Sequence, residues 1–498
     1  MNFSKSKYCS FCQCPKILWL NKYKPETFVS DSSTQERMEK GNAVGDLAMQ
    51  LFGDFVEVSA FDKDGNLDIA KMIENTNECL KNGTTNICEA SFFVDGLYCA
   101  VDILHKEQDG YAIYEVKSST HVSPVYITDV TYQKHVLEKC GIKVTGTFVV
   151  HINNEYVFDG KLDLQKFFTI KDVAHLVEEE SKNHDIDADL ITANKICDCE
   201  AEPDIDLSMN CREPYVCGYW DYCSRHLPKP NVFDVYRMSF GKKVEAYLSG
   251  YLEFGDVRKA LKLNQLQKRQ LDFVIKNIEE HIDKDGIKSF LQTLSYPLYF
   301  LDFETMQLTI PEFPNSKPYQ QITFQYSLHY IETEGGEIKH KEFLGESGVD
   351  PRRALAEQLI NDIPTNACVL AYNKGFECGR IRELAELFPD LSSSLLKIRD
   401  NVKDLIDPFH DGYYYNKAIG NSFSIKSVLP AMFPNDPELD YHNLEGVHNG
   451  GEAMNLFPKI KDLPLEEQAV ARKNLLKYCE LDTYAMVKIW QRLIEISK

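Results

Sequence analysis

Apolar residues along the chain occur in two patterns. Helical spacing appears near 375–388 and 467–495. Short apolar runs of strand length lie at 92–94, 98–104, 112–117, 144–151, 298–303, 321–331 and 367–372. Strands that alternate with helices in this way predict a protein of the α/β class.

The middle of the chain has a different character. It is rich in charge, and Leu271, Val274, Ile275 and Ile278 recur at helical spacing. A chain of 498 residues is long enough for roughly two to four domains. We therefore expect two α/β domains joined by a helical linker, with boundaries at 1–228, 229–295 and 296–498.

The charge balance limits the partners. The chain has 55 basic and 76 acidic residues, a net charge of −21, so nucleic acid would need a local basic groove or bound divalent cations. No apolar run reaches membrane-spanning length, and the N-terminus lacks the apolar core of a secretory signal. We therefore expect a cytoplasmic protein without a membrane partner, in which the 15 cysteines do not form a disulfide framework.

Paired carboxylates mark the second domain. Asp302 and Glu304 lie two residues apart in an apolar strand, so both side chains point to the same face. Two adjacent carboxylates are costly unless cations compensate them, and Mg²⁺ and Mn²⁺ bind such oxygen ligands. Taken alone, such a pair is more often two solvated acids on a strand.

Two further motifs follow in the same domain. Glu377 falls in the first turn of the helix that begins after the strand at 367–372. Tyr478 and Asp482 lie four residues apart on one helical face. Between these motifs lies the segment Ser424-Ile425-Lys426-Ser427-Val428-Leu429.

In this order the motifs resemble those of the DEDD (DnaQ-like) exonucleases of the tyrosine subtype. Glu377 stands where that family more often has Asp, and the segment at 424–429 is similar to one that often follows the second motif. The resemblance implies an RNase H-like fold and 3′–5′ exonuclease activity by a two-metal mechanism. It also implies that Tyr478 orients the attacking water and that Mg²⁺ or Mn²⁺ is held by Asp302, Glu304, Glu377 and Asp482.

The first domain carries a second constellation. Asp102 ends one apolar strand, Glu115 and Lys117 share a face of the next, and Gln133 lies on the helix that follows. This spacing resembles that of PD-(D/E)xK nucleases of the RecB-like branch, which have a restriction-endonuclease-like fold. The resemblance implies a divalent-metal site at Asp102 and Glu115, with Lys117 and Gln133 as catalytic residues. Glu89 could replace a histidine ligand that many relatives have and this sequence lacks. A surface Glu/Lys pair in a hairpin is the alternative for Glu115 and Lys117.

Cysteines flank the core of this first domain. Cys14 precedes it, and Cys211, Cys217 and Cys223 follow it at spacings wider than those usual in zinc fingers. One N-terminal and three C-terminal cysteines resemble the ligands of iron–sulfur RecB-type nucleases, which implies a 4Fe–4S cluster, with Zn²⁺ as the alternative. Cys9 or Cys12 could take the place of Cys14, and Cys197 and Cys199 could bind a separate ion.

Together, the two halves resemble a bacterial family that joins an iron–sulfur RecB-like domain to a DnaQ-like domain. The resemblance implies a metal-dependent nuclease with two active sites, and we expect it to act on DNA, with single-stranded DNA or DNA ends favoured. One alternative is an RNA 3′–5′ exonuclease whose N-terminal domain only binds nucleic acid. Another is a non-enzymatic assembly protein with decayed nuclease folds.

Overall fold

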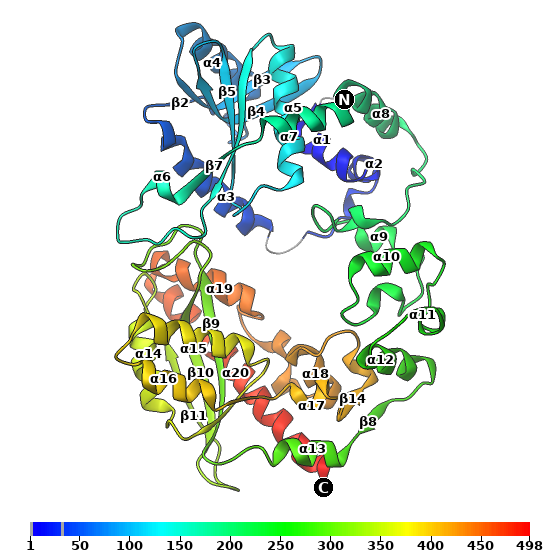
Figure 1. Cartoon of the computed structure of the whole chain (residues 1–498), viewed down its shortest axis with the longest axis vertical. Helices are drawn as coiled ribbons and strands as arrows, with labels where there is room; N and C mark the ends of the chain where they lie inside the picture. The colour runs from blue at the N-terminus through cyan, green and yellow to red at the C-terminus, as the bar shows by residue number, and fades with distance from the viewer. Residues whose placement is uncertain (1–2, 31–33) are drawn as a thin grey trace. The chain divides into compact units, whose positions relative to one another are not determined.

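The computed structural model describes residues 3–30 and 34–498. The chain divides into two compact units, each with its own sheet and core (Figure 1). Unit 1 comprises Met1–His226 and Thr309–Tyr319; unit 2 comprises Leu227–Leu308 and Gln320–Lys498. The helical region expected as a linker at 229–295 thus falls within unit 2. The expected α/β class is confirmed.

Unit 1 is built on one mixed sheet. Its strand order is β2-β3-β4-β5-β6-β7, with β1 paired to β4. β3, β4 and β5 form an antiparallel meander, and β6 lies parallel to β5 because helix α5 makes the crossover between them. The strands are β1 (Phe3–Ser4), β2 (Val56–Glu57), β3 (Asn86–Val94), β4 (Leu97–Lys106), β5 (Tyr111–Lys117), β6 (Val144–Ile152) and β7 (Phe168–Asp172).

Helices cover the unit 1 sheet and bury an apolar cluster on each face. One cluster includes Leu104, Ile113 and Val149, and the other includes Ile103, Ala112 and Val150, as expected for strands whose successive side chains alternate between faces. The helices are α1 (Lys5–Gln13), α2 (Lys16–Tyr23), α3 (Thr34–Ala48), α4 (Ile69–Asn82), α5 (Pro124–Lys139), α6 (Leu164–Phe167), α7 (Ala174–Asn183), α8 (Ile186–Asp198) and α9 (Trp220–Cys223).

Unit 2 is built on a second mixed sheet, of order β11-β10-β9-β12-β13. β9, β10 and β11 are antiparallel neighbours, whereas β12 runs parallel to both β9 and β13. Its strands are β9 (Leu298–Gln307), β10 (Gln321–Ile331), β11 (Lys339–Leu344), β12 (Cys368–Ala371) and β13 (Val402–Asp404); a separate antiparallel pair joins β8 (Glu280–Ile282) to β14 (Tyr414–Asn416).

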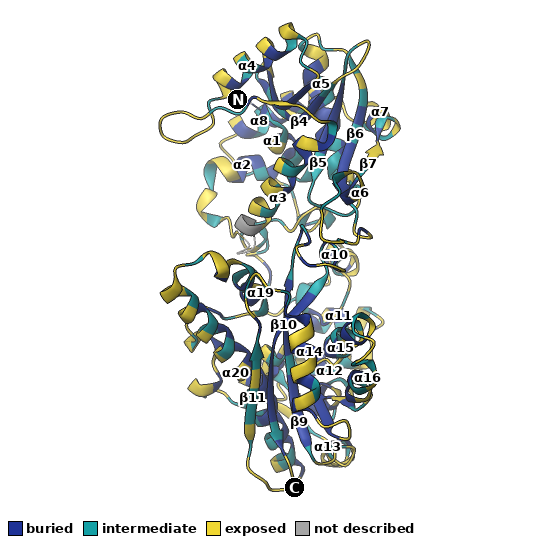
Figure 2. Cartoon of the chain, turned by 90° about the vertical axis from the view of Figure 1, so that its left-hand side faces the viewer, coloured by how far each residue is buried: buried dark blue, intermediate teal, exposed yellow. Residues whose placement is uncertain are grey.

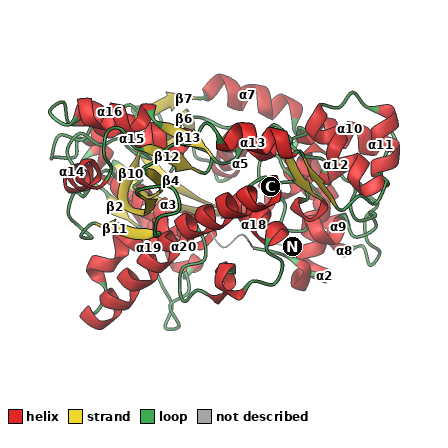
Figure 3. Cartoon of the chain, turned by 90° about the horizontal axis from the view of Figure 1, so that it is seen from below, coloured by secondary structure: helices red, strands yellow, loops and turns green. Residues whose placement is uncertain are grey.

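The helices of unit 2 cover a sheet whose central strands are almost wholly buried (Figure 2). The last of them, α20, runs for 33 residues and packs against β9, β10 and β11 (Figure 3). The helices are α10 (Phe240–Leu248), α11 (Phe254–Ala260), α12 (Gln265–Ile275), α13 (Lys284–Leu291), α14 (Arg352–Asp362), α15 (Gly375–Leu387), α16 (Ser392–Asp400), α17 (Asp407–His410), α18 (Ile425–Met432), α19 (Gly450–Lys459) and α20 (Leu465–Ser497).

The structure corrects one helix predicted from periodicity. α12 ends at Ile275, because Asn277 has a positive φ of 52° that stops the helix. Ile278 therefore lies outside α12 and Ile275 is exposed, while Leu271 is fully buried as expected. Within residues 3–30 and 34–498, no helix combines the length and the apolar character that a membrane span requires.

Candidate active site

The paired acids of unit 2 lie on the central strand of its sheet. Leu301 and Phe303 pack into the core, so Asp302 and Glu304 emerge together on the opposite face of β9. Glu304 is buried. The strand thus presents two carboxylates side by side, as the i, i+2 spacing predicted.

Glu377 lies in the first turn of α15 and is buried, with 3% of its surface exposed. The turn that leads into this helix is held by Asp404, whose carboxylate accepts hydrogen bonds from the backbone N–H groups of Asn373 at 2.8 Å and Lys374 at 2.9 Å. Asn373 has a positive φ of 67°, a conformation that asparagine tolerates. Asp404 was missed at the sequence level, because its role depends on β13 lying beside β12.

The third motif lies on α20. Tyr478 and Asp482 are both buried, and Asp482 accepts a hydrogen bond from the Tyr441 hydroxyl at 2.6 Å. The Cys479 thiol lies 3.8 Å from a carboxylate oxygen of Asp302. Neither Tyr441 nor Cys479 carried a signal in the sequence that set it apart from an ordinary core residue.

The charges of Asp482 and Glu377 act on both Asp302 and Glu304. Burial, together with the charges of Asp482, Glu304 and Glu377, holds the pKa of Asp302 well above its usual range. Burial likewise raises the pKa of Glu304 well above its usual range, with Asp482 adding to the effect and Lys426 opposing it. Burial raises the pKa of Glu377 to about 8 and that of Asp482 to about 6. In the absence of cations, these acids therefore resist ionisation.

This donor set fits divalent cations. Among the described residues, the Oε2 atom of Glu377 is one of a few buried side-chain oxygens without a hydrogen-bond partner. A buried carboxylate oxygen without a donor is costly, and a hard cation would satisfy it. Asp302, Glu304 and the Cys479 thiol also offer ligand atoms within 4.8 Å of one another. The residues present thus fit Mg²⁺ or Mn²⁺.

A cavity of about 500 Å³ is connected to these acids through Tyr441, which lines it and donates to Asp482. Lys426 and Tyr441 are among its lining residues, and the Lys426 ammonium group lies over the rings of Tyr441 and Tyr478 at 4.8 Å and 5.3 Å. Lys426 is the second residue of α18, which Ser424 precedes as the N-cap position. The segment at 424–429 therefore places the ammonium group of Lys426 close to the carboxylates of the site.

The candidate site of unit 1 is organised differently. Glu115 is fully buried on β5, where Lys117 donates to it at 2.5 Å and Gln133 at 2.7 Å. Lys5, the first residue of α1, donates to the same carboxylate at 2.9 Å. Lys117 also donates to Asp129 at 2.8 Å. The structure thus brings together the predicted Glu115, Lys117 and Gln133 and adds two residues, Lys5 and Asp129.

Asp102 and Glu89 complete this group. Asp102 accepts the backbone N–H of Val116 at 2.7 Å, and burial together with the charge of Glu115 raises its pKa to about 7. Glu89 lies on β3 with a positive φ of 58°, and burial raises its pKa, with Lys5 opposing the effect. Burial opposes ionisation of Glu115 as well, but Lys117 and Lys5 together hold its pKa well below the usual range.

The unit 1 site is therefore closer to charge balance than the unit 2 site. Lys5 and Lys117 form ion pairs with Glu115 and Asp129. In the unit 2 site, by contrast, Lys426 is the positive charge that acts on Glu304, so that site has the greater need of bound cations. The Oε1 atom of Gln133 is buried and, among the described side chains, lacks a hydrogen-bond partner. The same side chain donates to Glu115, and the metal site that the sequence predicts at Asp102 and Glu115 stays a prediction.

The four predicted cysteine ligands line a single cavity of unit 1. Cys14, Cys211, Cys217 and Cys223 all face it, and Cys211 accepts a hydrogen bond to its sulfur from the Ser208 N–H at 3.5 Å. Burial raises the pKa values of the Cys14 and Cys217 thiols, and hydrogen bonds from backbone N–H groups partly oppose this effect. Four thiols with N–H donors are a donor set that suits an iron–sulfur cluster or zinc.

The remaining four cysteines of these segments do not line this cavity: Cys9, Cys12, Cys197 and Cys199. Cys12 packs against the sheet core of unit 1, and Cys9 lies near Asp129 and Lys117. Cys197 is buried, whereas Cys199 is exposed. Cys14 is therefore the N-terminal cysteine that lies with the other three predicted ligands.

Both units are thus mixed α/β domains, and each contains buried carboxylates. Residues 299–424 match a family described as a domain of unknown function (DUF2779); apart from Thr309–Tyr319, these residues belong to unit 2. This match includes Asp302, Glu304 and Glu377 but ends before Tyr478 and Asp482.

Two relatives are similar to parts of the chain. "Uncharacterized protein UU173" of Ureaplasma parvum serovar 3 is 27% identical over 43% of this chain and 33% of its own length. "Uncharacterized protein MG366" of Mycoplasma genitalium is 29% identical over 38% of this chain and 31% of its own length. The chain thus spans about a third of these relatives. No solved structure matches it.

Proposed function

We propose that unit 2 is a metal-dependent nuclease that hydrolyses phosphodiester bonds of DNA from the 3′ end. The carrying observation is the buried group of Asp302, Glu304, Glu377 and Asp482, whose raised pKa values and unpartnered Glu377 oxygen call for cations. Antiparallel strands β11, β10 and β9 followed by parallel β12 and β13 support an RNase H-like fold, with the first two acids on the central strand.

The four carboxylates would hold two Mg²⁺ or Mn²⁺ ions, which activate water and stabilise the leaving oxygen of a phosphodiester. Burial and the charge of Asp482 raise the pKa of Tyr478, so its hydroxyl stays protonated and can orient the attacking water. Tyr441 donates to Asp482 and thereby fixes the orientation of that carboxylate. Lys426 supplies a positive charge to a phosphate group at the edge of the site.

The cavity that Tyr441 connects to the acids supports a polynucleotide substrate. Its lining combines Lys426 with the ring of Tyr441, two histidines, two asparagines and the acids Asp436 and Asp440, so it offers one positive charge, stacking and hydrogen bonds to a nucleotide. A net charge of −21 disfavours a broad basic surface. We therefore infer that recognition is confined to the site and favours single strands or ends.

For unit 1, we infer a RecB-like PD-(D/E)xK nuclease of restriction-endonuclease-like fold. The carboxylates of Asp102 and Glu115 would hold one divalent ion, with Glu89 as a further ligand. Lys117 and Gln133 contact the same Glu115 carboxylate, which supports their role at the reacting phosphate. A 4Fe–4S cluster on Cys14, Cys211, Cys217 and Cys223 would link the N-terminal helices to the segment at 211–223. Zn²⁺ is the alternative to the cluster.

Cleavage assays test both proposals. Wild type and Asp302→Asn are compared on end-labelled single-stranded DNA and RNA with Mn²⁺, Mg²⁺ or EDTA, with Glu386→Gln, an exposed acid of α15, as the control. We expect metal-dependent shortening from the 3′ end of DNA that the Asp302 variant loses and the control keeps. Cleavage that persists in Asp302→Asn and disappears in Glu115→Gln would assign it to unit 1. Shortening of RNA alone would favour the exoribonuclease alternative, and no cleavage of either polymer would refute the proposal.

A further inference from the structure

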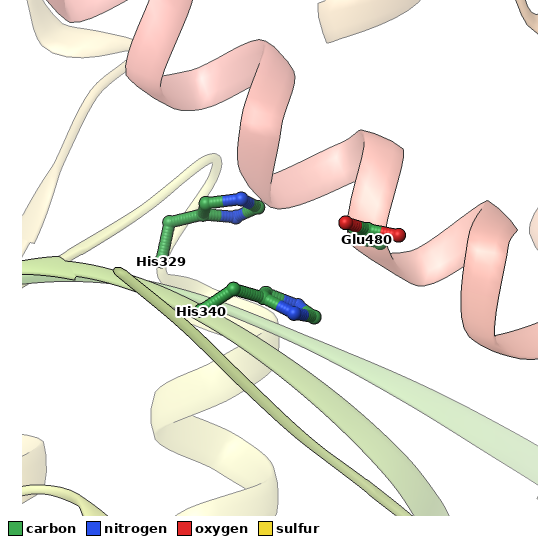
Figure 4. A group of neighbouring side chains, drawn as sticks. All are labelled: His329, His340 and Glu480. Carbon is green, nitrogen blue, oxygen red and sulfur yellow. The ribbon is translucent and has the colours of Figure 1, made fainter. Parts of the chain in front are cut away.

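A second group of ligand-type side chains lies elsewhere in unit 2. His329 is on β10 and His340 is its direct partner on β11, so both rings lie on the same face of the sheet. Helix α20 packs against these two strands and contributes Glu480. The two rings lie one above the other and the Glu480 carboxylate faces them from α20 (Figure 4).

The spacing of the three residues is compatible with a metal site. Each offers one ligand atom, and these three atoms all lie within 4.8 Å of one another. The ring centroids of His329 and His340 are 4.6 Å apart. Glu480 is exposed, and its long side chain can adjust to complete the coordination of a small ion.

A hydroxyl network engages one nitrogen of each ring. The Thr483 hydroxyl donates to the Glu480 backbone carbonyl at 3.1 Å and therefore accepts from the Ser327 hydroxyl, 2.7 Å away, and from His329 Nδ1, 2.8 Å away. Ser327 in turn accepts from His340 Nε2 at 2.9 Å. One assignment of donors that gives every proton in this chain an acceptor places N–H groups on His329 Nδ1 and His340 Nε2.

This arrangement leaves His329 Nε2 and His340 Nδ1 with lone pairs. Metal-ligating histidines usually donate their second ring nitrogen to a fixed partner, which sets the tautomer and the ring orientation. Both imidazoles are thus prepared to act as ligands.

We propose that His329, His340 and Glu480 bind a Zn²⁺ ion at a site separate from the carboxylate group. Two imidazoles and one carboxylate favour Zn²⁺ over the hard ions suited to an all-oxygen site, and three protein ligands leave a fourth position for water. The ion would link β10 and β11 to α20. If the proposed nuclease function holds, the same ion stabilises the helix that carries Tyr478 and Asp482.

The test uses the full chain, dialysed against chelator and titrated with Co²⁺ as a probe for Zn²⁺. Tetrahedral Co²⁺ with nitrogen and oxygen ligands absorbs strongly in the visible range, and thiolate ligands add distinct charge-transfer bands, so the cysteine site is seen separately. We expect the tetrahedral nitrogen–oxygen bands to be present in wild type and displaced by Zn²⁺. The double variant His329→Ala/His340→Ala should lack them and bind one equivalent less.

Two milder variants keep the test informative if the double variant does not fold. Glu480→Gln changes an exposed residue, and Thr483→Val removes only the hydroxyl that orients His329; loss of such a partner typically weakens metal binding about 10–100-fold. Exposed His281→Ala and Glu467→Gln are the matched controls, with affinity expected to be unchanged.

Equal Co²⁺ spectra and stoichiometry in wild type and all these variants would overturn the zinc proposal. Asp302→Asn should keep the tetrahedral bands while losing cleavage, which separates this site from the proposed active site. Bands in a wild-type protein that cleaves no nucleic acid would support the zinc site and refute the nuclease function alone.

Discussion

Replacing Glu377 with glutamine should stabilise the metal-free protein at alkaline pH. Burial raises the pKa of Glu377 from 4.5 to about 8, so the folded protein keeps this proton to a higher pH than the unfolded chain does. The associated stability is fully present below pH 4.5 and is lost as the pH rises to about 8. Since one pKa unit corresponds to about 1.4 kcal/mol, ionising Glu377 costs the folded state about 5 kcal/mol.

Glutamine has the shape of the protonated acid and carries no charge. We therefore expect Glu377→Gln to unfold at higher temperature than wild type at pH 9 in EDTA, by up to roughly 10–20 °C for a unit of this size. At pH 5 the two proteins should differ little, because wild type is then mostly protonated. Mn²⁺ should raise the unfolding temperature of wild type at pH 9 far more than that of the variant.

Differential scanning calorimetry of the full chain measures this effect, with Glu386→Gln on the same helix as the control. The control should show no pH-dependent gain, since Glu386 is exposed. The reasoning is refuted if Glu377→Gln is no more stable than wild type at pH 9 in EDTA, or if its gain is the same at pH 5.

Three further predictions follow from the two sites. Tyr478→Phe should lower the cleavage rate about 10²-fold with little change in Mn²⁺ affinity measured by calorimetry, because the hydroxyl acts on water and not on the metal; an unchanged rate would contradict this role. Lys117→Ala in an Asp302→Asn background should abolish any remaining metal-dependent cleavage in a gel assay, and persisting cleavage would exclude unit 1 as its source. Cys211→Ser should remove the visible absorption of an iron–sulfur cluster from anaerobically purified protein, whereas the exposed Cys199→Ser should retain it; equal spectra would reject the cluster assignment.

Local patterns were sufficient for the elements that carry the carboxylates. Spacing of two along β9 placed Asp302 and Glu304 on one face, and spacing of four along α20 did the same for Tyr478 and Asp482, because these periods follow from backbone geometry alone. Periodicity could not predict where α12 ends, since its end depends on the backbone conformation of Asn277.

The neighbours of these side chains were decided by tertiary structure. Lys5 reaches Glu115 across 110 residues of sequence, and Tyr441 reaches Asp482 across 41. The pairing of His329 with His340 depends on strand register, and Glu480 joins them only because α20 packs on that face. Periodicity predicts which side of its own element a residue occupies, but the packing of whole elements determines which charges and ligands meet, and with them the pKa values and metal preferences of each site.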